Sequence, residues 1–561
     1  MKIARELTTE VLIIGGGGAG LRAALAAAEA GSQVLLTNKG PVAKSGITLT
    51  AAGGLQVPFH PDDSPEQFFQ DTVAAGYDLG DQNLVRVLAE EAVSRALDIE
   101  RYGGKILRRS DGNYAMRQLP GQSRPRNIFL AGGGIGLATA LDKACRQQGN
   151  ISMLDDFLVT GLLKAAAPDE TAVAGAIGVN LGDGEIWQIN ARAVVMATGG
   201  CQWLWEVNDC PSDATGDGIL HAYRAGAQLV DMEMVLFYPS VIVWPPSLAG
   251  AFVHYEFLSP AMLDGNVYDK DGKPVLAKPM PVRDEAMRQM AKAIGGGRGT
   301  DRGGLKWYVG DSPQPQEVVR KMLNTTQYNY IRAHGVEPAT DQIEVAPGAH
   351  YLMGGISIDE RCQTSLQGLF ATPECAGNFD GANRLAGSGL TATQVFGAKA
   401  GLSAHQWAGA NRQQKVDPTG LDGEIGRVAG RVAAGGQAGA PLRELRDQLR
   451  SAVQRYAGVH RDAVGLTKLN AVAGAVRTEL AGVRVPSVPA FNQQLVDLLQ
   501  LEVMCELAGL IAGSAMARQE SRGHHFRTDF PHRDEANWLK HTLVTAGETG
   551  PHFSSKAVIR L

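Results

Sequence analysis

Three glycines near the start of the chain have the spacing that lets a backbone bind a pyrophosphate. Gly15, Gly17 and Gly20 form a Gly-x-Gly-x-x-Gly sequence directly after the apolar run 11–14. In such a turn the first glycine permits the bend, the second lets the backbone approach the phosphates, and the third lets a helix pack on a strand. The phosphates would lie at the helix N-terminus, where free N–H groups and the helix dipole favour an anion. The sequence therefore predicts a dinucleotide cofactor.

The end of the next predicted strand argues against NAD as this cofactor. NAD sites usually place an acidic residue there, which holds the ribose hydroxyls. This chain has Thr37-Asn38-Lys39 at that point, without a carboxylate. A different dinucleotide is therefore expected.

A parallel sheet must position these glycines, and the surrounding patterns predict one. Residues 11–14 and 33–37 are predicted strands, and the alanine-rich stretch 21–30 between them is a predicted helix. Further buried strands are predicted at 193–197 and 369–372. The expected fold class is α/β, with a Rossmann-like domain assembled from distant segments.

Changes in composition predict the domain organisation. Residues 1–233 and 346–410 are expected to form a discontinuous cofactor-binding domain. Residues 234–345 are richer in proline and aromatic residues and contain a hairpin-like turn, which predicts an inserted α+β capping domain that binds the substrate.

The last third of the chain is predicted to be mostly helical. Residues 411–522 should form a helical domain, opened by a polar linker at 411–422. Within it, the stretch 441–456 places four apolar residues on one helical stripe: Leu442, Leu445, Leu449 and Val453. Residues 523–561 are polar with scattered aromatics and are expected to form an extended tail.

The overall composition of the chain excludes several kinds of partner and cofactor. The formal charge is only −5 over 561 residues, which gives no reason to expect nucleic acid as a partner. None of the six cysteines forms a Cys-x-x-Cys pair, so we expect no iron–sulfur cluster and no metal held by this chain. No signal-peptide core and no apolar run of about 18 residues is present. The expected location is the cytoplasm, either free or peripheral to a membrane through a partner.

Several short motifs follow one another in a specific order between about residue 10 and about residue 542. They are Ala51-Ala52-Gly53-Gly54, Thr215-Gly216-Asp217-Gly218, His350-Tyr351-Leu352-Met353-Gly354-Gly355-Ile356, Gly381-Ala382-Asn383-Arg384-Leu385, Ser521-Arg522-Gly523 and Asn537-Trp538-Leu539-Lys540-His541-Thr542. In this order they resemble the flavoproteins of the succinate dehydrogenase, fumarate reductase and L-aspartate oxidase family.

The resemblance implies FAD as the cofactor. It implies that Ala52, Gly53 and Gly54 face the isoalloxazine ring, that Asp217 lies near the adenosine part, and that Glu374 binds a ribityl hydroxyl. The remaining residues that it assigns to the cofactor, together with the glycine turn, are Lys39, Arg384 and Ser388.

The resemblance also implies how FAD is held. Respiratory family members often attach FAD covalently through a histidine just before the Ala-Ala-x-Gly-Gly loop. The matching stretch here is Gly46-Ile47-Thr48. FAD should therefore be bound without a covalent bond. The covalent link goes with a higher flavin potential in the family, so its absence favours reduction of an alkene or oxidation by a strong acceptor.

Hydride transfer beside a carboxylate needs a cationic clamp and a proton donor. The family uses an arginine within an Arg-Asp-x-x-Ser-Arg segment as the proton donor. The matching segment here runs from Arg283 to Arg288, and Arg288 is the predicted donor. His350 and Arg384 are predicted to bind a substrate carboxylate, because a guanidinium suits a planar carboxylate.

Two departures from the family concern the substrate. A family segment Phe-His-Pro-Thr is Phe237-Tyr238-Pro239-Ser240 here, so a carboxylate-binding histidine has become Tyr238, which carries no charge. Tyr238 and Ser240 are predicted to contact the substrate. The family's Thr-Glu pair is not evident, although Glu256 lies near its place. A bulkier or less charged unsaturated acid than succinate or fumarate is therefore expected.

Three functions stay open on the sequence. The leading one is hydride transfer between FAD and the C–C bond next to a carboxylate of a small organic acid. The second is an amino-acid oxidase like L-aspartate oxidase, which works alone. The third is a non-catalytic FAD-binding electron-transfer subunit. The C-terminal motifs also resemble members that work with an iron–sulfur subunit, which makes such a partner a hypothesis.

Overall fold

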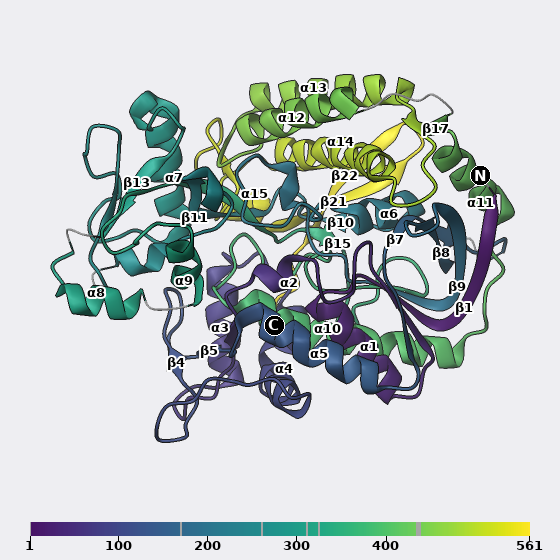
Figure 1. Cartoon of the computed structure of the whole chain (residues 1–561), viewed down its shortest axis with the longest axis horizontal. Helices are drawn as coiled ribbons and strands as arrows, with labels where there is room; N and C mark the ends of the chain where they lie inside the picture. Colours follow the sequence, from purple (N-terminus) through teal and green to yellow (C-terminus); the bar gives the residue numbers. More distant parts are fainter. Residues whose placement is uncertain (1, 169–170, 260–261, 310–311, 324–325, 434–438) are drawn as a thin grey trace.

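The computed structural model describes residues 2–168, 171–259, 262–309, 312–323, 326–433 and 439–561. A seven-stranded sheet forms the centre of its cofactor-binding half (Figure 1). Its strand order is β6-β2-β1-β9-β8-β7, and β16 pairs with β9 beside the end of β8. The strands are β1 (Ile3–Ile14), β2 (Val34–Thr37), β6 (Ile151–Leu154), β7 (Phe157–Lys164), β8 (Val173–Asn180), β9 (Glu185–Met196) and β16 (Leu369–Ala371).

The parallel part of this sheet carries the glycine turn. β1 pairs in parallel with β2 and with β9, and β9 pairs in parallel with β16. Helices α1 (Gly18–Glu29), α5 (Gly133–Gln147) and α10 (Ser388–Ala410) lie side by side along this region (Figure 1). Strands covered in this way are apolar along their length. The predicted α/β fold and the strands predicted from the apolar runs are confirmed.

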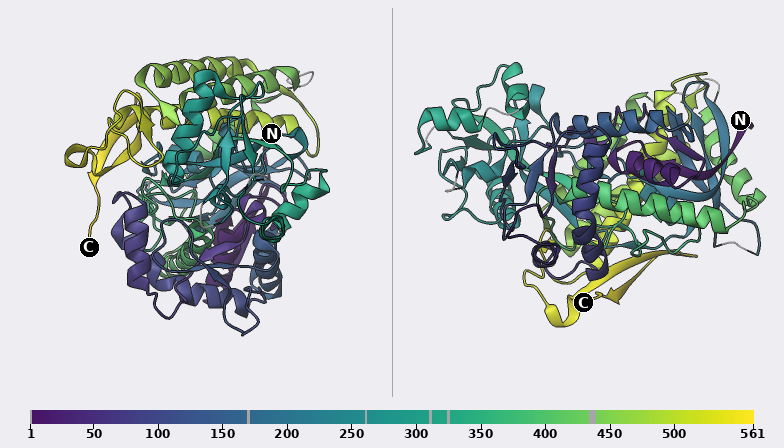
Figure 2. Two further views of the ribbon diagram at one scale, coloured as in Figure 1. Left: turned by 90° about the vertical axis from the view of Figure 1, so that its left-hand side faces the viewer. Right: turned by 90° about the horizontal axis from the view of Figure 1, so that it is seen from below.

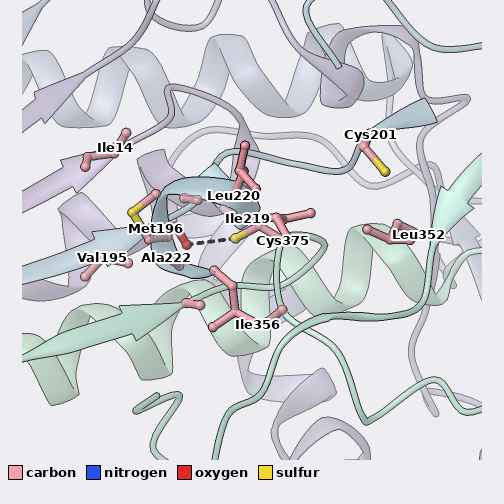
Figure 3. Close-up of a cluster of buried hydrophobic side chains, with 14 of the residues drawn as sticks. Ile14, Val195, Met196, Cys201, Ile219, Leu220, Ala222, Leu352, Ile356 and Cys375 are labelled. Atoms are coloured by element: carbon pink, nitrogen blue, oxygen red, sulfur yellow. Dashed lines mark hydrogen bonds between the residues drawn. The ribbon is translucent and has the colours of Figure 1, made fainter. Parts of the chain in front are cut away.

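A dense apolar cluster surrounds the C-terminal end of β9 (Figure 3). Helix α6 (Asp217–Ala225) packs its buried Ile219 and Leu220 there, near Met196 at the end of β9. The Cys375 thiol donates to the Met196 carbonyl oxygen over 3.2 Å. The chain that follows β16 is therefore fixed in place directly after Glu374.

The segment predicted to form the capping domain has a sheet of its own, at the left of Figure 1, with the order β11-β14-β13-β12. Its elements are β11 (Val235–Trp244), β12 (Asn266–Tyr268), α7 (Arg283–Ala293), β13 (Leu305–Tyr308), α8 (Gln316–Met322), α9 (Thr326–Ala333) and β14 (Ile343–Leu352). A separate apolar core, which includes Trp307 and Tyr328, holds it together. Strand β14 runs through the boundary predicted at 345/346, so the capping domain and the cofactor domain share this strand.

Helices α11 (Pro418–Ala429), α12 (Gly439–Tyr456), α13 (Ala463–Gly482) and α14 (Gln493–Ala517) follow. The predicted stripe on α12 is buried, as expected. The predicted linker 411–422 is partly helical, because the Asp417 side chain accepts from the N–H groups of Thr419 and Gly420 and starts α11 at Pro418. None of the helices within the described residues is long and apolar enough to cross a bilayer.

The predicted extended tail at 523–561 folds in a different way. Strands β21 (Lys540–Gly547) and β22 (Gly550–Ala557) form a hairpin, and β21 pairs with β10 (Leu229–Val230). The hairpin projects from one side of the molecule (Figure 2). The Thr542 N–H also donates to Asp231, 311 residues earlier in the chain. Such distant pairing leaves no local signal, which is why the sequence did not predict it.

The remaining elements are smaller or peripheral. They are α2 (Ile47–Thr50), β3 (Gly54–Gln56), α3 (Pro65–Ala75), α4 (Gln82–Arg101), β4 (Met116–Arg117), β5 (Asn127–Phe129), η1 (Gln202–Leu204), η2 (Pro246–Leu248), η3 (Tyr255–Leu258), η4 (Ile294–Arg298), β15 (Gly355–Ile356), β17 (Val432–Ala433), β18 (His460–Arg461), β19 (Val485–Pro486), β20 (Phe526–Arg527) and α15 (Glu535–Trp538).

Candidate active site

A cavity of about 1270 Å³ is lined both by the cofactor-binding domain and by the capping domain. Pockets for one drug-sized ligand usually measure about 300–1,000 Å³, so this cavity has room for a dinucleotide and a second molecule. The glycine turn and α2 line one part of it, and β11, η3 and α9 contribute residues to another.

The glycine turn has the geometry that its spacing predicts. Gly15 has φ +116°, and a Cβ there would collide with the Ala197 carbonyl oxygen. A Cβ on Gly20 would collide with the Gly15 carbonyl oxygen, which is the predicted close packing of helix on strand. Gly17 lines the cavity, yet a Cβ there would meet no protein atom closer than 3.5 Å. Glycine at this position therefore leaves space for a ligand rather than for the protein itself.

Lys39 and Asp217 come together at the same part of the cavity. The Lys39 Nζ lies 2.6 Å from Asp217 Oδ2 and donates to Thr215 Oγ1 over 3.0 Å. Lys39 and Asp217 both line the cavity. Burial would raise the pKa of Asp217, but Lys39 outweighs this effect and lowers it, so Asp217 is ionised.

The loop predicted to face the isoalloxazine ring also lines the cavity, with Ala52, Gly53 and Gly54 all on its wall. Far from this loop in sequence, helix α10 starts at the cavity: Gly387 and Gly389 line it, and Ser388 between them is buried without lining it. Free N–H groups at such a helix start can meet polar ligand atoms. Ser388 therefore contributes through its place on α10 and not as part of the wall.

Several buried polar atoms of the cavity wall have no hydrogen-bond partner within the described part of the chain. Such atoms cost free energy unless a ligand or water satisfies them, so they indicate a polar ligand. They are Asn127 Oδ1, Thr198 Oγ1, Asp213 Oδ1, His221 Nδ1, Arg283 Nε, Tyr351 Oη and Arg384 Nε.

Glu374 lines the cavity just after β16 and is buried. The Gln202 amide donates to its carboxylate. Burial raises the pKa of Glu374 to about 7, although the Gln202 hydrogen bond and Arg384 oppose this effect. A buried carboxyl of this kind can pair with a ligand hydroxyl.

Arg384 and His350 both line the cavity, as the predicted clamp requires. The Arg384 guanidinium carbon lies 4.2 Å from the centre of the Tyr351 ring. This contact holds the plane of the guanidinium group in place. His350 Nδ1 lies 2.7 Å from Asp209 Oδ2, and the Asp209 side chain is only 2% exposed. This contact fixes the imidazole, so Nε2 is the ring nitrogen that can meet a ligand. Asp209 was not predicted from the sequence.

The structure does not place the predicted proton donor Arg288 on the cavity wall. Its guanidinium lies 2.8 Å from Glu285 and 3.2 Å from Asp284 and donates to the Gly523 carbonyl oxygen. Arg283, at the other end of the same segment, lines the cavity instead. Five residues correspond to a rotation of about 140° on a helix, so both arginines cannot face one cavity.

Arg283 is the first residue of α7 and is 9% exposed. Burial alone would lower its pKa, but Tyr255 and Glu256 nearby outweigh burial and raise it. Arg283 is therefore a buried cation beside a buried acid.

Tyr238 lines the cavity, whereas Ser240 does not. The Ser240 hydroxyl donates to the Val253 carbonyl oxygen over 2.5 Å, so it serves the capping domain and not a substrate. The Tyr238 hydroxyl donates to Glu256 Oε2 over 2.6 Å. Burial, followed by Glu256, raises the pKa of Tyr238 well above its usual range, so Tyr238 is neutral.

The sequence did not predict some other residues that line the cavity. The sequence indicated only that Glu256 lies near the place of the family's Thr-Glu pair. In the structure its side chain is buried beside Tyr238. Phe252 and His254 line the cavity but belong to no motif. Within the described residues no cluster of His, Cys, Asp and Glu side chains could hold a metal ion.

Comparisons with known proteins agree with this site. A family model described as FAD binding domain matches residues 10–390, and one described as fumarate reductase flavoprotein C-term matches residues 446–560. A fumarate reductase (CoM/CoB) polypeptide of Methanothermobacter marburgensis is 34% identical over 544 residues, which is 95% of this chain and 96% of that protein. The L-aspartate oxidase of Caulobacter vibrioides is 30% identical over 97% of this chain and 98% of that protein.

Among solved structures, a mutated flavoprotein of the E. coli quinol fumarate reductase matches with a TM-score of 0.89. The match covers 99% of this chain and 98% of that chain, at 29% sequence identity. The fold and the cavity thus define a flavoprotein oxidoreductase. The chain belongs to the family of succinate dehydrogenase, fumarate reductase and L-aspartate oxidase flavoproteins. It is an FAD-dependent oxidoreductase of the class that acts on CH–CH groups, and its cofactor is FAD.

Proposed function

We propose that this protein transfers a hydride between FAD and the C–C bond next to the carboxylate of an organic acid other than plain succinate or fumarate. One observation carries the proposal: the predicted flavin-facing loop, the Arg384–His350 pair and the buried cation Arg283 all line one cavity. FAD, when bound, supplies the reversible uptake and release of a hydride. The protein must supply binding, orientation and a proton.

In this proposal Arg384 binds the substrate carboxylate with its planar fork. His350 assists it through Nε2, and Asp209 positions the imidazole ring. The carboxylate next to the reacting carbon is thereby held, and negative charge that develops on it is stabilised.

Arg283 takes the place of Arg288 as the proposed proton donor. The resemblance assigns this role to an arginine, because arginine is otherwise a poor acid. The geometry favours Arg283, which lines the cavity and lies near Glu256, a buried carboxylate through which the proton could be replaced.

Several finer points belong to the same proposal. FAD is bound without a covalent bond, since Ile47 stands where an attachment histidine would be and lines the cavity. A separate iron–sulfur subunit, with the protein peripheral to a membrane through such a partner, is supported by the family resemblance alone. The C-terminal hairpin is already folded within this chain, so it gives no support to a partner that would order it.

The second candidate is an amino-acid oxidase, favoured by the similarity to L-aspartate oxidase and by Glu256, whose carboxylate could pair with an ammonium group. The third, a non-catalytic electron-transfer subunit, is opposed by a cavity wall that includes Arg283, His350 and Arg384.

The experiment is an anaerobic assay of the FAD-loaded protein against unsaturated acids with reduced viologen dye. Saturated acids and L-aspartate are tested with an oxidised dye. Turnover of at least one acid other than fumarate, succinate and L-aspartate supports the proposal, and turnover of fumarate or succinate alone contradicts it. Turnover of L-aspartate alone supports the second candidate, and failure of every substrate supports the third.

A further inference from the structure

The capping domain lines the substrate end of the cavity with a mostly aromatic surface, of which the proposed function uses only Glu256. We call this surface the cap wall. Its members are Tyr238, Phe252, His254, Glu256, Phe257 and Met262, which all line the cavity. Two questions decide what it can bind: where its aromatic rings lie, and which charges remain for a ligand.

The aromatic rings of the cap wall form one continuous surface that begins at the carboxylate clamp. The Phe252 ring centre lies 6.2 Å from that of His350, 5.1 Å from that of Tyr238 and 5.4 Å from that of His254, each in an edge-to-face arrangement. His254 continues to Phe257 at 5.1 Å. A ligand whose carboxylate meets His350 therefore has Phe252 directly beside it.

The cap wall offers no cation for a second carboxylate. The Tyr238 hydroxyl is already donated to Glu256. Burial lowers the pKa of His254, so this imidazole is neutral. Two cations outside the cap wall line the same cavity close to it. Arg283 lies near the Glu256 carboxylate, which balances its charge, and Arg117 helps to lower the pKa of His254. A second carboxylate of the substrate would approach Glu256, and like charges placed together at a buried site are strongly unfavourable.

We propose that the substrate is a 2,3-unsaturated monocarboxylic acid with an aromatic ring on C3, or its saturated counterpart. The carboxylate would bind Arg384 and His350, and the ring would pack against Phe252 and Phe257, where edge-to-face contacts favour another ring. This inference rests on the proposed function for its redox step. Addition of one hydride and one proton across C2=C3 gives the saturated acid and consumes the two electrons of the reduced flavin, and the reverse reaction returns them.

Binding is measured first, because it does not depend on turnover. The oxidised FAD-loaded protein is titrated with 3-phenylpropenoate, crotonate and fumarate, and the change in flavin absorption gives each Kd. These acids share the C2=C3 bond and one carboxylate, and differ only in a phenyl, a methyl or a second carboxylate. Burial of the phenyl ring should make binding about 10- to 100-fold tighter than that of crotonate. Fumarate should bind roughly 100-fold more weakly than 3-phenylpropenoate.

Two variants test whether the cap wall causes this preference. Phe252→Ala should lower the ratio of the crotonate Kd to the 3-phenylpropenoate Kd by about tenfold. Phe59→Ala is the matched control, since Phe59 stacks on Tyr114 and does not line the cavity. FAD content and melting temperature report folding, and Phe252→Leu replaces Phe252→Ala if the latter loses FAD.

A third variant tests whether the charge of Glu256 disfavours a second carboxylate on the substrate. Glu256→Gln keeps the shape of the side chain and removes its charge, so the fumarate Kd should fall by about tenfold relative to that of 3-phenylpropenoate. An unchanged ratio in this variant contradicts the charge argument.

The outcomes separate this inference from the proposed function. Equal binding of crotonate and 3-phenylpropenoate, or tighter binding of fumarate, overturns the inference, and any reduction of crotonate or 3-phenylpropenoate then leaves the proposed function standing. Preferred binding of 3-phenylpropenoate without reduction of any acid supports the recognition and removes the redox assignment. If none of the three acids binds, the inference falls, and the wider panel of acids decides separately whether the proposed function stands.

Discussion

The assignment of the proton donor can be decided by two substitutions within one helix. Arg283 and Arg288 lie in the same segment, but only Arg283 lines the cavity. Replacing each in turn by glutamine removes the charge and keeps most of the side-chain length. The two variants therefore differ only in which face of α7 loses its cation.

The expected losses differ by orders of magnitude. Arg283→Gln removes a proton donor, which usually contributes about 10²- to 10⁴-fold to kcat. It also removes a buried positive charge that acts on Glu256, so the variant should be less stable than the parent protein. Arg288 is 22% exposed and pairs with Glu285, which is 42% exposed. This exposed pair is worth about 0.2–1 kcal/mol. Arg288 also lies 3.2 Å from Asp284, which is 3% exposed, so some further stability should be lost. Because Arg288 does not line the cavity, kcat should change by less than about fivefold.

The assay is single-turnover reoxidation of the reduced, FAD-loaded protein by its best acid substrate, followed by flavin absorption. This step isolates the chemistry from product release. FAD content is measured alongside, so that a variant that has lost its cofactor is not mistaken for a slow one. A loss of about 10³-fold in Arg288→Gln, with Arg283→Gln near the parent rate, would refute the assignment and restore the motif-based prediction.

The site leads to three further predictions, and the family resemblance leads to a fourth. Trichloroacetic acid should release all FAD into solution, because Ile47 offers no attachment atom; flavin fluorescence that stays with the chain in a denaturing gel would contradict this. Asp209→Asn should lower kcat/KM by about 10- to 100-fold while FAD stays bound, since the hydrogen bond between a carboxylate and His350 is lost. Burial raises the pKa of Asp380 to about 7, although Arg384 opposes it, so the folded protein keeps a proton that the unfolded chain loses above about pH 4. Stability should therefore fall as the pH rises from about 4 to about 7, and a plot of melting temperature against pH should be flatter for Asp380→Asn. Anaerobic affinity purification from the native host should recover an iron–sulfur protein, and a fully active chain recovered alone would exclude that partner.

Local patterns made the cofactor half of the molecule predictable. The apolar runs, the alanine-rich helix and the glycine turn each lie within a few residues of one another, and parallel strands covered on both faces are apolar without interruption. The observed β1, α1 and β2 therefore agree with the predicted elements to within a few residues, apart from an earlier start of β1. That extension, residues 3–10, is mostly polar and pairs with β9, so only its partner strand reveals it.

The choice between Arg283 and Arg288 shows what the spacing of a motif cannot predict, namely the face of the helix on which each residue lies. One residue of the predicted segment, Arg283, lines the cavity, but a motif does not say which of its two arginines faces inward. The helix phase decides this, and the phase depends on packing: Asp284 accepts from Tyr77 over 2.7 Å and anchors the start of α7 against the cofactor domain. Tyr77 lies 207 residues from Asp284, so no local pattern could set that phase.

Asp209, which the sequence did not predict as a site residue, is also placed by a contact between distant parts of the chain. Its position matters for the function because it orients His350. It lies after η1, in a stretch without periodicity, and it meets His350 from 141 residues away. The contact exists because Ala349, next to His350, forms a bridge with Asn208 near the end of β14. This backbone bridge brings the Asp209 carboxylate to Nδ1 of His350. The other ring nitrogen, Nε2, is thereby directed to the ligand. The orientation of the clamp is therefore a property of the fold around β14, and the histidine motif alone identifies only one half of it.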